Sequence, residues 1–482
     1  MDTQLINTFS STRILCVGDV MLDRFVRGSV SRISPEAPIP VLHIKDEETV
    51  LGGAGNVVRN LKALGCTVTF ISVVGKDQNG SRIQELLKSS SHVEAHLMVD
   101  EKRETTTKTR FIASNQQILR TDRERVLSLS ETHEKELLKL FKDHVQDHDL
   151  VVLSDYAKGL FSPQGLQALI KEAQAHKKPV LVDPKGHDFS RYQGATLLTP
   201  NRQELAQATL LPTQTHDEVV AASEKIIKMC NLNSMITTRG PEGMSLIDAS
   251  GTIEHLPTTA LEIFDVSGAG DTVIATLAAS LAAGGTLSDA MHFANVAAGL
   301  VVAKVGTAVV HQDELLTALH HQELESHEKK IVSWQAAQDI TQKWKRRGQR
   351  IVFTNGCFDL LHPGHVTLLA RARKAGDRLV VGLNTDHSVS RYKGPTRPIQ
   401  PEMARALVLA SLASVDLVVL FGQDFPLELI EALKPDVLVK GADYTIENVS
   451  GASFVQSYGG EVLLIDLVEG QSTTKIVTRI GQ

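Results

Sequence analysis

Two histidines, His362 and His365, stand three positions apart in NGCFDLLHPGHVTLL (355–369), directly after an apolar run. At the start of a helix, residues at i and i+3 lie on one side, so both imidazoles can face one ligand. Zinc binding needs three or four ligands, and no nearby Cys/His pair completes such a set. Neutral imidazoles at a helix N-terminus can instead donate N–H groups to a triphosphate and stabilise charge on its α-phosphate. A purely structural role is the alternative, and it suits one histidine better than both.

A glycine turn with an aspartate behind it, DVSGAGDTVIA (265–275), is a further candidate. Small residues before a helix let backbone N–H groups converge on an anion, and the helix dipole favours that anion. Asp271 falls in the first helical turn, beside the place where a phosphoryl group would rest. We expect Asp271 to accept the proton of an attacking hydroxyl. The alternative is a glycine turn followed by an acidic residue with no chemical role.

Carboxylates also follow several apolar runs, as in GDVMLD (18–23), SDYAKG (154–159) and DPKG (183–186). A second glycine-rich helix start, GGAGNVVRNLKALG (52–65), fails the dinucleotide fingerprint because Val58 occupies the third glycine position. Acidic and amide side chains at strand ends commonly bind sugar hydroxyls. The predicted sugar-binding residues are Asp19, Asp23, Gly53, Asn56, Asp155 and Lys185.

The segments GGAGN and DVSGAGD resemble the two signatures of the ribokinase-like (PfkB) carbohydrate kinases, and the resemblance extends over residues 12–310. It implies that Gly268, Ala269 and Gly270 form an anion hole and that Asp271 is the catalytic base. It also implies indirect binding of Mg²⁺ by Glu204. The nucleotide-binding residues that it implies are Asn201, Arg202, Gln203, Glu204, Gly240 and Gly243. The sequence departs from the family signature at two positions, where Val266 replaces the commoner Thr and Val273 replaces the commoner Phe. Neither residue takes part in the proposed chemistry.

The histidine segment resembles the G-x-F-D-x-x-H-x-G-H signature of the cytidylyltransferase-like nucleotidyltransferases, which is present in full. The resemblance implies catalytic roles for His362 and His365, with direct attack on the nucleotide and no covalent nucleophile. The late segment STTKI matches a further phosphate-binding helix start of that family. The implied nucleotide-binding residues are Gly356, Phe358, Asp359, Lys393, Arg397, Ser472, Thr473 and Thr474. A surface loop is the alternative interpretation of Lys393 and Arg397.

The elements that must position these residues alternate between short β-branched runs and helical patterns, which predicts parallel α/β sheets. Together with the resemblances, this indicates a ribokinase-like three-layer α/β domain over 1–315. A smaller Rossmann-like nucleotidyltransferase α/β domain is expected over 333–482, opening with a helix at 333–348. Between them we expect a linker at 316–332, within a polar helix (311–332) whose four histidines lack metal-ligand spacing.

Composition narrows the classes of function. The 482 residues carry a formal net charge of −6, which argues against bulk nucleic-acid binding. Four scattered cysteines indicate reduced thiols. The N-terminus lacks a signal-peptide pattern, and the apolar stretch at 272–283 is too short to cross a membrane. We expect a cytoplasmic homodimer that binds neither nucleic acid nor a membrane.

The order of the two units resembles the bifunctional enzymes of Gram-negative bacteria that join a heptose 7-phosphate kinase to a heptose 1-phosphate adenylyltransferase. The resemblance implies phosphorylation of D-glycero-β-D-manno-heptose 7-phosphate at C1 and formation of ADP-heptose for the lipopolysaccharide core. It further implies ATP as the substrate of both domains. Two alternatives stay open: another sugar kinase fused to a cytidylyltransferase, and a non-catalytic sugar-phosphate sensor.

Such a pair of reactions lacks one step, because the kinase would make a bisphosphate and the transferase would use the 1-phosphate. The segment DHDLV (147–151) fits the outline of a phosphatase motif. In this segment, however, the apolar run follows the aspartates. In the phosphatase motif the aspartates follow the apolar strand. Asp147 and Asp149 are therefore predicted to form a helix-to-strand turn, and a separate phosphatase is expected to act between the two steps.

Overall fold

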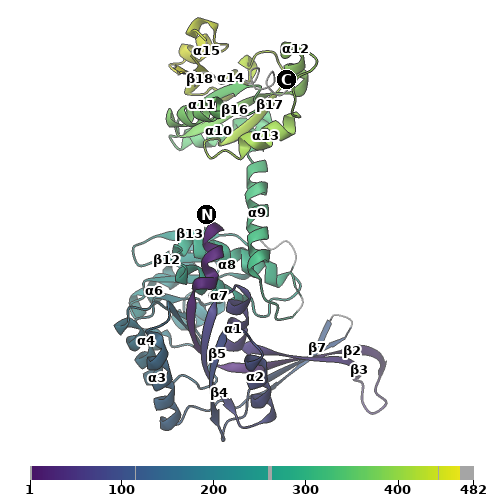
Figure 1. Cartoon of the computed structure of the whole chain (residues 1–482), viewed down its shortest axis with the longest axis vertical. Coiled ribbons are helices and arrows are strands. Elements are labelled where there is room, and N and C mark those ends of the chain that lie inside the picture. The colour runs from purple at the N-terminus through teal and green to yellow at the C-terminus, as the bar shows by residue number, and fades with distance from the viewer. Residues whose placement is uncertain (1–2, 114–115, 259–262, 305, 443, 467–482) are drawn as a thin grey trace. The chain divides into compact units, whose positions relative to one another are not determined.

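The computed structural model describes residues 3–113, 116–258, 263–304, 306–442 and 444–466. The chain divides into two compact units, Met1–Leu319 and His320–Gln482. Each unit has its own central sheet, as Figure 1 shows.

The first unit is built on a nine-stranded sheet within the described residues. Seven neighbouring strands run parallel, and the last two pair antiparallel at one edge. In spatial order they are β13 (Ile253–Leu256), β12 (Met244–Asp248), β11 (Ser234–Thr238), β10 (Leu197–Leu198), β9 (Val180–Asp183), β8 (Leu150–Ser154), β1 (Arg13–Gly18), β4 (Thr67–Gly75) and β5 (Val93–Asp100).

Helices cover both faces of this sheet because alternate residues of each strand point to opposite sides. In β1, Ile14 and Cys16 enter one core, whereas Leu15 and Val17 enter the other. The first core includes α1 (Ala54–Ala63), α2 (Gln78–Lys88), α7 (Ala269–Ala282) and α8 (Leu287–Val302). The second includes α3 (Glu131–Val145), α4 (Pro163–Ala175), α5 (Arg202–Thr209) and α6 (His216–Cys230). The predicted three-layer α/β fold is confirmed.

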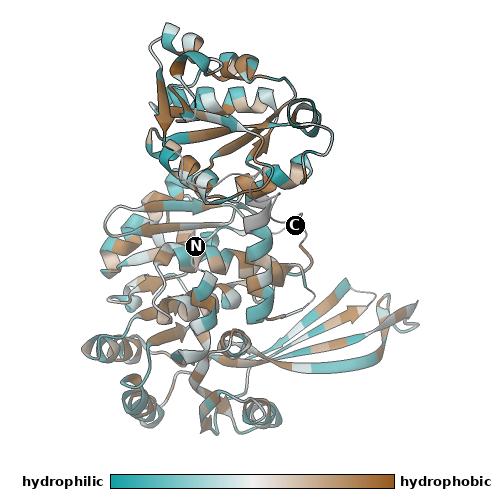
Figure 2. Ribbon diagram, turned by 45° about the horizontal axis from the view of Figure 1, so that its top comes forward, coloured by the Kyte–Doolittle hydropathy of each residue, from teal (hydrophilic) through white to brown (hydrophobic). Residues whose placement is uncertain are grey.

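A separate four-stranded sheet extends from the body of the first unit (Figure 1), and the sequence patterns did not predict it. Its strands, in spatial order, are β3 (Pro40–Gly53), β2 (Val20–Ile33), β6 (Thr107–Ala113) and β7 (Gln116–Arg123). Figure 2 shows hydrophobic and hydrophilic segments interleaved along it. Ile33, Ile44 and Leu119 on these strands are exposed. This sheet therefore has no buried face along much of its length.

The second unit is built on a six-stranded sheet whose paired strands all run parallel. In spatial order they are β14 (Ile331–Val332), β17 (Leu417–Phe421), β16 (Arg378–Asn384), β15 (Ile351–Gly356), β18 (Val437–Gly441) and β19 (Glu461–Ile465). Its helices are α10 (Trp334–Arg346), α11 (Pro363–Lys374), α12 (Asp386–Lys393), α13 (Glu402–Ala410), α14 (Leu427–Leu433) and α15 (Ala452–Ser457). Val352 packs on one face and Phe353 on the other, which matches the predicted smaller α/β unit.

The segment between the units is more structured than a solvated linker. Helix α9 (Gln312–Glu328) begins inside the first unit, where Leu315 and Leu319 are buried in the core. Beyond it, Ile331 and Val332 pair with Val418 and Val419 as an edge strand of the second sheet. Both ends of the expected 316–332 linker thus belong to packed structure. The exact domain boundaries remain a prediction.

Three local predictions agree with the structure. Ser333 caps α10 by accepting a hydrogen bond from the Ala336 amide, and Gly348 follows the helix with φ 73°. Asp147 and Asp149 lie in the turn between α3 and β8. The apolar stretch 272–283 forms most of the buried helix α7. None of the described helices is both long and apolar enough to cross a membrane.

Candidate active sites

The first site is centred on the N-terminus of α7. Gly268 caps this helix with φ 85°, a left-handed conformation that favours glycine. A Cβ at Gly268 would lie 2.7 Å from Nδ2 of Asn56, so a larger residue would displace that side chain. A Cβ at Gly270 would meet nothing within 4 Å, so space is left beside the first turn. The predicted anion hole of Gly268, Ala269 and Gly270 is thus a helix start with room for a group beside it.

Asp271 is buried in the first turn of α7, and both of its carboxylate oxygens have a donor. The Tyr156 hydroxyl donates to Oδ1 at 2.6 Å, and Asn56 Nδ2 donates to Oδ2 at 2.8 Å. Burial raises the pKa of Asp271 to about 6, although these two hydrogen bonds act in the opposite direction. A carboxylate with this pKa is largely ionised at neutral pH and still basic enough to accept a proton.

Tyr156 is a residue that the sequence patterns missed. Burial and the Asp271 charge raise the pKa of its hydroxyl well above the ordinary value, so it remains a donor. Asp19 and Asp155 hold the loop that carries it. Asp19 accepts hydrogen bonds from the amides of Tyr156, Lys158 and Leu160 at 3.0–3.1 Å. Asp155 accepts from the Ala157 amide and the Tyr192 hydroxyl, each at 2.8 Å.

The parallel strands bring the predicted acidic residues to one edge of the sheet. Asp19 follows β1, Asp155 follows β8, and Asp183 ends β9. Burial raises the pKa of Asp183 well above the ordinary value, and the nearby carboxylates of Asp271 and Glu204 raise it further. Asp183 was not among the predicted site residues, although it opens the quoted DPKG segment.

The other predicted sugar-binding residues lie around this edge with partners of their own. Asp23 on β2 forms a buried ion pair with Arg110 at 2.9 Å. Gly53, with φ 56°, caps α1, whose Asn56 contacts Asp271. Lys185 Nζ lies 2.6 Å from Oε1 of Glu204. Sugar binding by these residues, and by Asp19 and Asp155, remains a prediction.

The predicted Asn-x-x-Glu motif forms a capping box at the start of α5. The Glu204 amide donates to Asn201 Oδ1 at 2.9 Å, and the Asn201 amide donates to Glu204 Oε2 at 3.0 Å. Arg202 forms an ion pair with Glu242 at 2.8 Å, while Gln203 is exposed. The Asn/Glu spacing is therefore explained locally by the capping of α5. The other carboxylate oxygen of Glu204 pairs with Lys185.

A cavity of about 190 Å³ adjoins the anion hole. Gly240, Gly243, Ala269 and Gly270 line it together, although the sequence separates the first pair from the second by more than twenty residues. Gly243 has φ 86°, and a Cβ there would lie 1.9 Å from the Leu256 carbonyl oxygen. Apolar side chains line the remainder, among them Met244, Val273 and Val302. An aromatic base would fit such a cavity, with its phosphates directed at α7.

The second site lies at the carboxyl end of β15. His362 caps α11, and its ring stacks on that of His365 with centroids 3.8 Å apart and planes 24° apart. Burial lowers the pKa of His362. Burial, with contributions from His362 and Lys393, lowers the pKa of His365 to about 4. Both imidazoles are therefore neutral at neutral pH and present N–H groups beside a helix N-terminus.

A cavity of about 370 Å³ opens beside the ring of His365, whereas His362 is not among the residues that line it. Five predicted residues line it, namely Gly356, Phe358, Asp359, His365 and Lys393. Asn384 and Lys440, at the ends of β16 and β18, also line it and were missed. Each follows an apolar run, RLVVGL (378–383) and VLV (437–439), so the strand-end rule that found Asp155 could have found them.

Asp359 and Arg405 hold the loops around this cavity. Asp359 is buried and accepts hydrogen bonds from Arg397 Nε at 2.5 Å and from the Ile399 amide at 2.7 Å. Arg405 is also buried and donates to the Cys357 carbonyl oxygen at 2.6 Å. The predicted phosphate contact of Arg397 remains a prediction, since its Nε is paired with Asp359. Ser472, Thr473 and Thr474 lie outside the described residues.

Comparison with known proteins gives the class of each unit. Residues 11–313 match the pfkB family carbohydrate kinases, and residues 353–477 match the cytidylyltransferase-like family. The fold and its two sites thus define a carbohydrate kinase joined to a nucleotidyltransferase. Bifunctional HldE proteins of Paramagnetospirillum magneticum and Rhodospirillum rubrum are 55% and 52% identical to this chain, over 98% and 99% of it and 96% of each relative. The chain belongs to this bifunctional family, which confirms the predicted resemblance.

Solved structures show the same fold for the first unit. Phosphofructokinase-2 from Escherichia coli, in complex with substrates and products, matches with a TM-score of 0.55 and 20% identity, over 64% of this chain and 99% of its own. Ribokinase from Arabidopsis thaliana, complexed with ribose and ATP, matches with a TM-score of 0.50 and 20% identity, over 64% and 98%.

Proposed function

We propose that the first unit transfers the γ-phosphoryl group of ATP to the C1 hydroxyl of D-glycero-β-D-manno-heptose 7-phosphate. The second unit then transfers the adenylyl group of ATP to heptose 1-phosphate, and the product is ADP-heptose for the lipopolysaccharide core. Family membership and the two separate sites support this assignment. The observation that carries the kinase assignment is the buried carboxylate of Asp271 in the first turn of α7, directly after Ala269 and Gly270, which line an apolar cavity.

In the kinase reaction, Asp271 accepts the proton of the C1 hydroxyl as that oxygen attacks the γ-phosphorus. Tyr156 and Asn56 fix the orientation of the carboxylate, because each donates to one of its oxygens. The amides at the start of α7 stabilise negative charge on the transferred group, and the apolar cavity holds the base of ATP. Anchoring the nucleotide there places its phosphates against Asp271.

The acidic residues at the sheet edge fit a divalent cation. The elevated pKa of Asp183 reflects burial and the negative charges of Asp271 and Glu204, and a cation would relieve this repulsion. Glu204 and Asp183 would hold Mg²⁺ indirectly, through bound water. The ion would neutralise charge on the β- and γ-phosphates when it is bound.

In the transferase reaction, an oxygen of the sugar 1-phosphate attacks the α-phosphorus of ATP, and pyrophosphate leaves. The neutral imidazoles of His362 and His365 donate N–H groups to the α-phosphate as charge develops on it. Lys393 lines the same cavity and supplies positive charge for the triphosphate. Asp359 acts indirectly here, since it holds the 397–400 loop against the cavity.

Product analysis by mass spectrometry tests the whole assignment. With heptose 7-phosphate, ATP and magnesium, the purified protein should accumulate the 1,7-bisphosphate and make no ADP-heptose until a separate phosphatase is added. Parallel reactions of heptose 1-phosphate with ATP and CTP distinguish an adenylyltransferase from a cytidylyltransferase. Formation of ADP-heptose from heptose 7-phosphate by this chain alone would contradict the need for a phosphatase. An absence of ATP turnover in both assays would favour a sensor.

One contact in the structure supports the prediction that the DHDLV segment is a turn and not a phosphatase motif. Asp149 accepts a hydrogen bond from the Arg13 amide at 2.8 Å, so its carboxylate closes the turn between α3 and β8. This contact supports the structural interpretation of the DHDLV segment.

We further propose that the protein is a cytoplasmic homodimer. The exposed Ile33, Ile44 and Leu119 of the four-stranded sheet support a second copy as its partner, because an apolar surface of this kind gains stability when it is covered. Light scattering of the full chain should give twice the mass of one chain, and Ile44→Lys should lower it. A monomer at micromolar concentrations would contradict this part of the proposal.

A further inference from the structure

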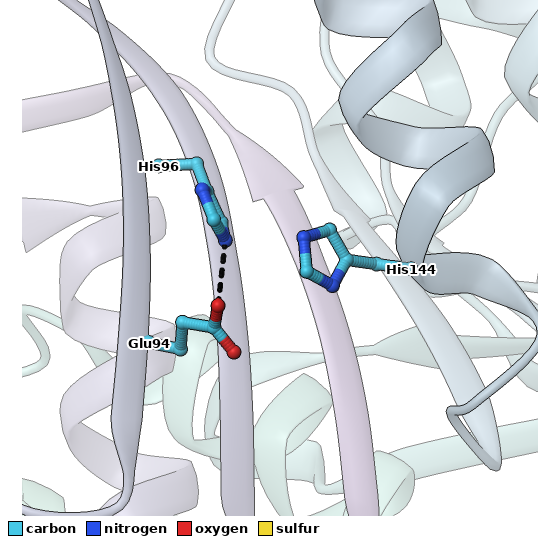
Figure 3. Close-up of side chains that lie close together, drawn as sticks. All are labelled: Glu94, His96 and His144. Carbon is cyan, nitrogen blue, oxygen red and sulfur yellow. Dashed lines mark hydrogen bonds and ion pairs between the residues drawn. The ribbon is translucent and has the colours of Figure 1, made fainter.

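Three side chains with metal-binding groups meet on the outside of the first unit, away from the candidate active site of that unit. Glu94 and His96 lie two positions apart on the edge strand β5, so they share one face of the sheet. His144 comes from the last turn of α3 and faces them (Figure 3). One potential ligand atom from each residue lies within 4.8 Å of the other two. Nε2 of His96 is 3.1 Å from Oε1 of Glu94, and the two imidazole centroids are 4.6 Å apart.

We propose that Glu94, His96 and His144 bind one divalent transition-metal ion of the zinc type. Two imidazole nitrogens and a carboxylate oxygen are a ligand set that zinc accepts, with water at the remaining position. Tetrahedral zinc places neighbouring ligand atoms roughly 3.3 Å apart. The His96–Glu94 spacing of 3.1 Å is close to this value, and the exposed Glu94 and half-buried His144 side chains have room to adjust. Magnesium and calcium prefer oxygen ligands, which this site provides from a single residue.

A neighbouring histidine holds this arrangement in place. His148 Nδ1 lies 2.7 Å from the carbonyl oxygen of His144, and this ring nitrogen must carry the proton because a carbonyl only accepts. Nε2 of His148 therefore accepts from the Thr69 hydroxyl at 2.8 Å. Thr69 on β4 is the register partner of Glu94 on β5. The segment that carries His144 is thus fastened beside the strand that carries the other two ligands.

A bound ion would connect the edge strand β5 to α3. Strand β5 pairs on one side only, with β4, so its outer edge lacks a neighbouring strand among the described residues. Three metal–ligand bonds would stabilise the folded state over the unfolded chain, in which these ligands are dispersed. We therefore expect zinc to raise the thermal stability of the first unit without taking part in either reaction.

The chain offers a matched control in His176 and Glu172 on α4. His176 Nε2 lies 3.4 Å from Glu172 Oε1, so this pair repeats the histidine–carboxylate contact. Among the residues that the structure describes, no third ligand joins this pair, whereas His144 joins Glu94 and His96. A histidine–glutamate pair alone should bind zinc much more weakly than the three-ligand group.

The test is a zinc titration of the tag-free full-length protein, stripped of metal and free of nucleotide, against a chromophoric chelator. The wild type should bind one more zinc ion than His144→Gln, and His96→Gln should weaken this ion by at least about tenfold. His176→Gln should titrate as the wild type does. Zinc bound elsewhere on the chain contributes equally to all of these variants.

Thermal unfolding provides a second readout, in which zinc raises the midpoint of the wild type and of His176→Gln but not of His144→Gln. Kinase rates in zinc-free buffer should match in all variants, since none of these residues belongs to the catalytic site. Equal zinc binding by the wild type and both ligand variants, or no zinc binding by the wild type, would overturn the proposal.

Discussion

The Tyr156 hydroxyl donates a 2.6 Å hydrogen bond to Oδ1 of Asp271, although 115 positions separate the two residues in the sequence. This bond favours the ionised carboxylate, and so does the bond from Asn56. Burial has the larger and opposite effect, and the resulting pKa is about 6. The basicity of the proposed catalytic base therefore depends on a residue of another element.

Tyr156→Phe should raise the pKa of Asp271 further, because it removes a donor to the carboxylate and leaves the burial. Kinase activity requires the ionised form, so it falls as the pH drops through about 6 in the wild type. In the variant, this acid limb of kcat/KM should move to higher pH. The pH dependence of adenylyl transfer in the same preparation serves as the control. An unmoved acid limb would show that Tyr156 does not tune the base.

Asp271→Asn should lower the kinase rate by at least ~10²-fold, the usual scale for a lost general base, and leave adenylyl transfer intact. A raised pKa means that ionised Asp271 destabilises the folded state at neutral pH, and this cost disappears as the pH falls below the unfolded value. The variant should therefore be no less stable than the wild type at neutral pH. Steady-state rates and thermal unfolding measure both effects. A kinase rate close to normal would remove Asp271 from the proposed role.

His365→Ala should cost adenylyl transfer on the order of 10²-fold, the scale for a lost transition-state donor, with kinase activity unchanged. The wild type should show no loss of adenylyl transfer from protonation of His365 until the pH approaches about 4, because its pKa lies there. Rates of pyrophosphate release across the pH range measure this. Equal losses of both activities in the variant would point to a structural histidine.

Separating the units should yield two folded enzymes, and the stability of the C-terminal fragment should depend on where the chain is cut. The Val418 amide donates to the Lys330 carbonyl oxygen at 2.8 Å, and β14 pairs with β17 directly after it. A C-terminal fragment that begins at Lys329 retains this edge strand, whereas one that begins at Ser333 loses it. We expect the longer fragment to unfold at the higher temperature.

Tryptophan fluorescence reports this difference, since both tryptophans, Trp334 and Trp344, belong to α10 of the second unit. The indole of Trp334 donates to the Leu420 carbonyl oxygen of β17 at 2.7 Å, next to the strand in question. Equal midpoints for the two fragments would show that β14 contributes nothing to the second sheet. The first unit alone should retain kinase activity, and its loss would show that the kinase requires the second unit.

The sequence patterns predicted the parallel sheets and the helix starts because buried strands are continuous apolar runs and because Gly53 and Gly268 each cap the start of a helix. They missed the four-stranded sheet, because strands such as β3 are exposed over much of their length and lack a buried face. The charged run Lys-Asp-Glu-Glu in the middle of β3 has the composition of a loop when the sequence is considered alone.

Tyr156 was missed for a different reason. Nothing in the neighbouring sequence marks Tyr156, which meets Asp271 only through the fold. In Asp19, the carboxylate oxygens accept hydrogen bonds from three backbone amides, which its strand-end position did not indicate, and its sugar contact remains a prediction. A position at a strand end shows which edge a residue reaches, whereas its partners depend on the loops that fold over that edge.

The four-stranded sheet begins beside the residues of the proposed kinase site. Strand β2 starts directly after Asp19, and β3 ends at Gly53, the cap of the helix whose Asn56 donates to Asp271. The two strands pair from Val20 and Gly53 outward. The outer part of the projecting sheet is thus joined by one continuous pair of strands to the start of α1, the helix that carries Asn56. A contact that shifts the inner ends of β2 and β3 would therefore act on the Asp271 carboxylate through the hydrogen bond from Asn56.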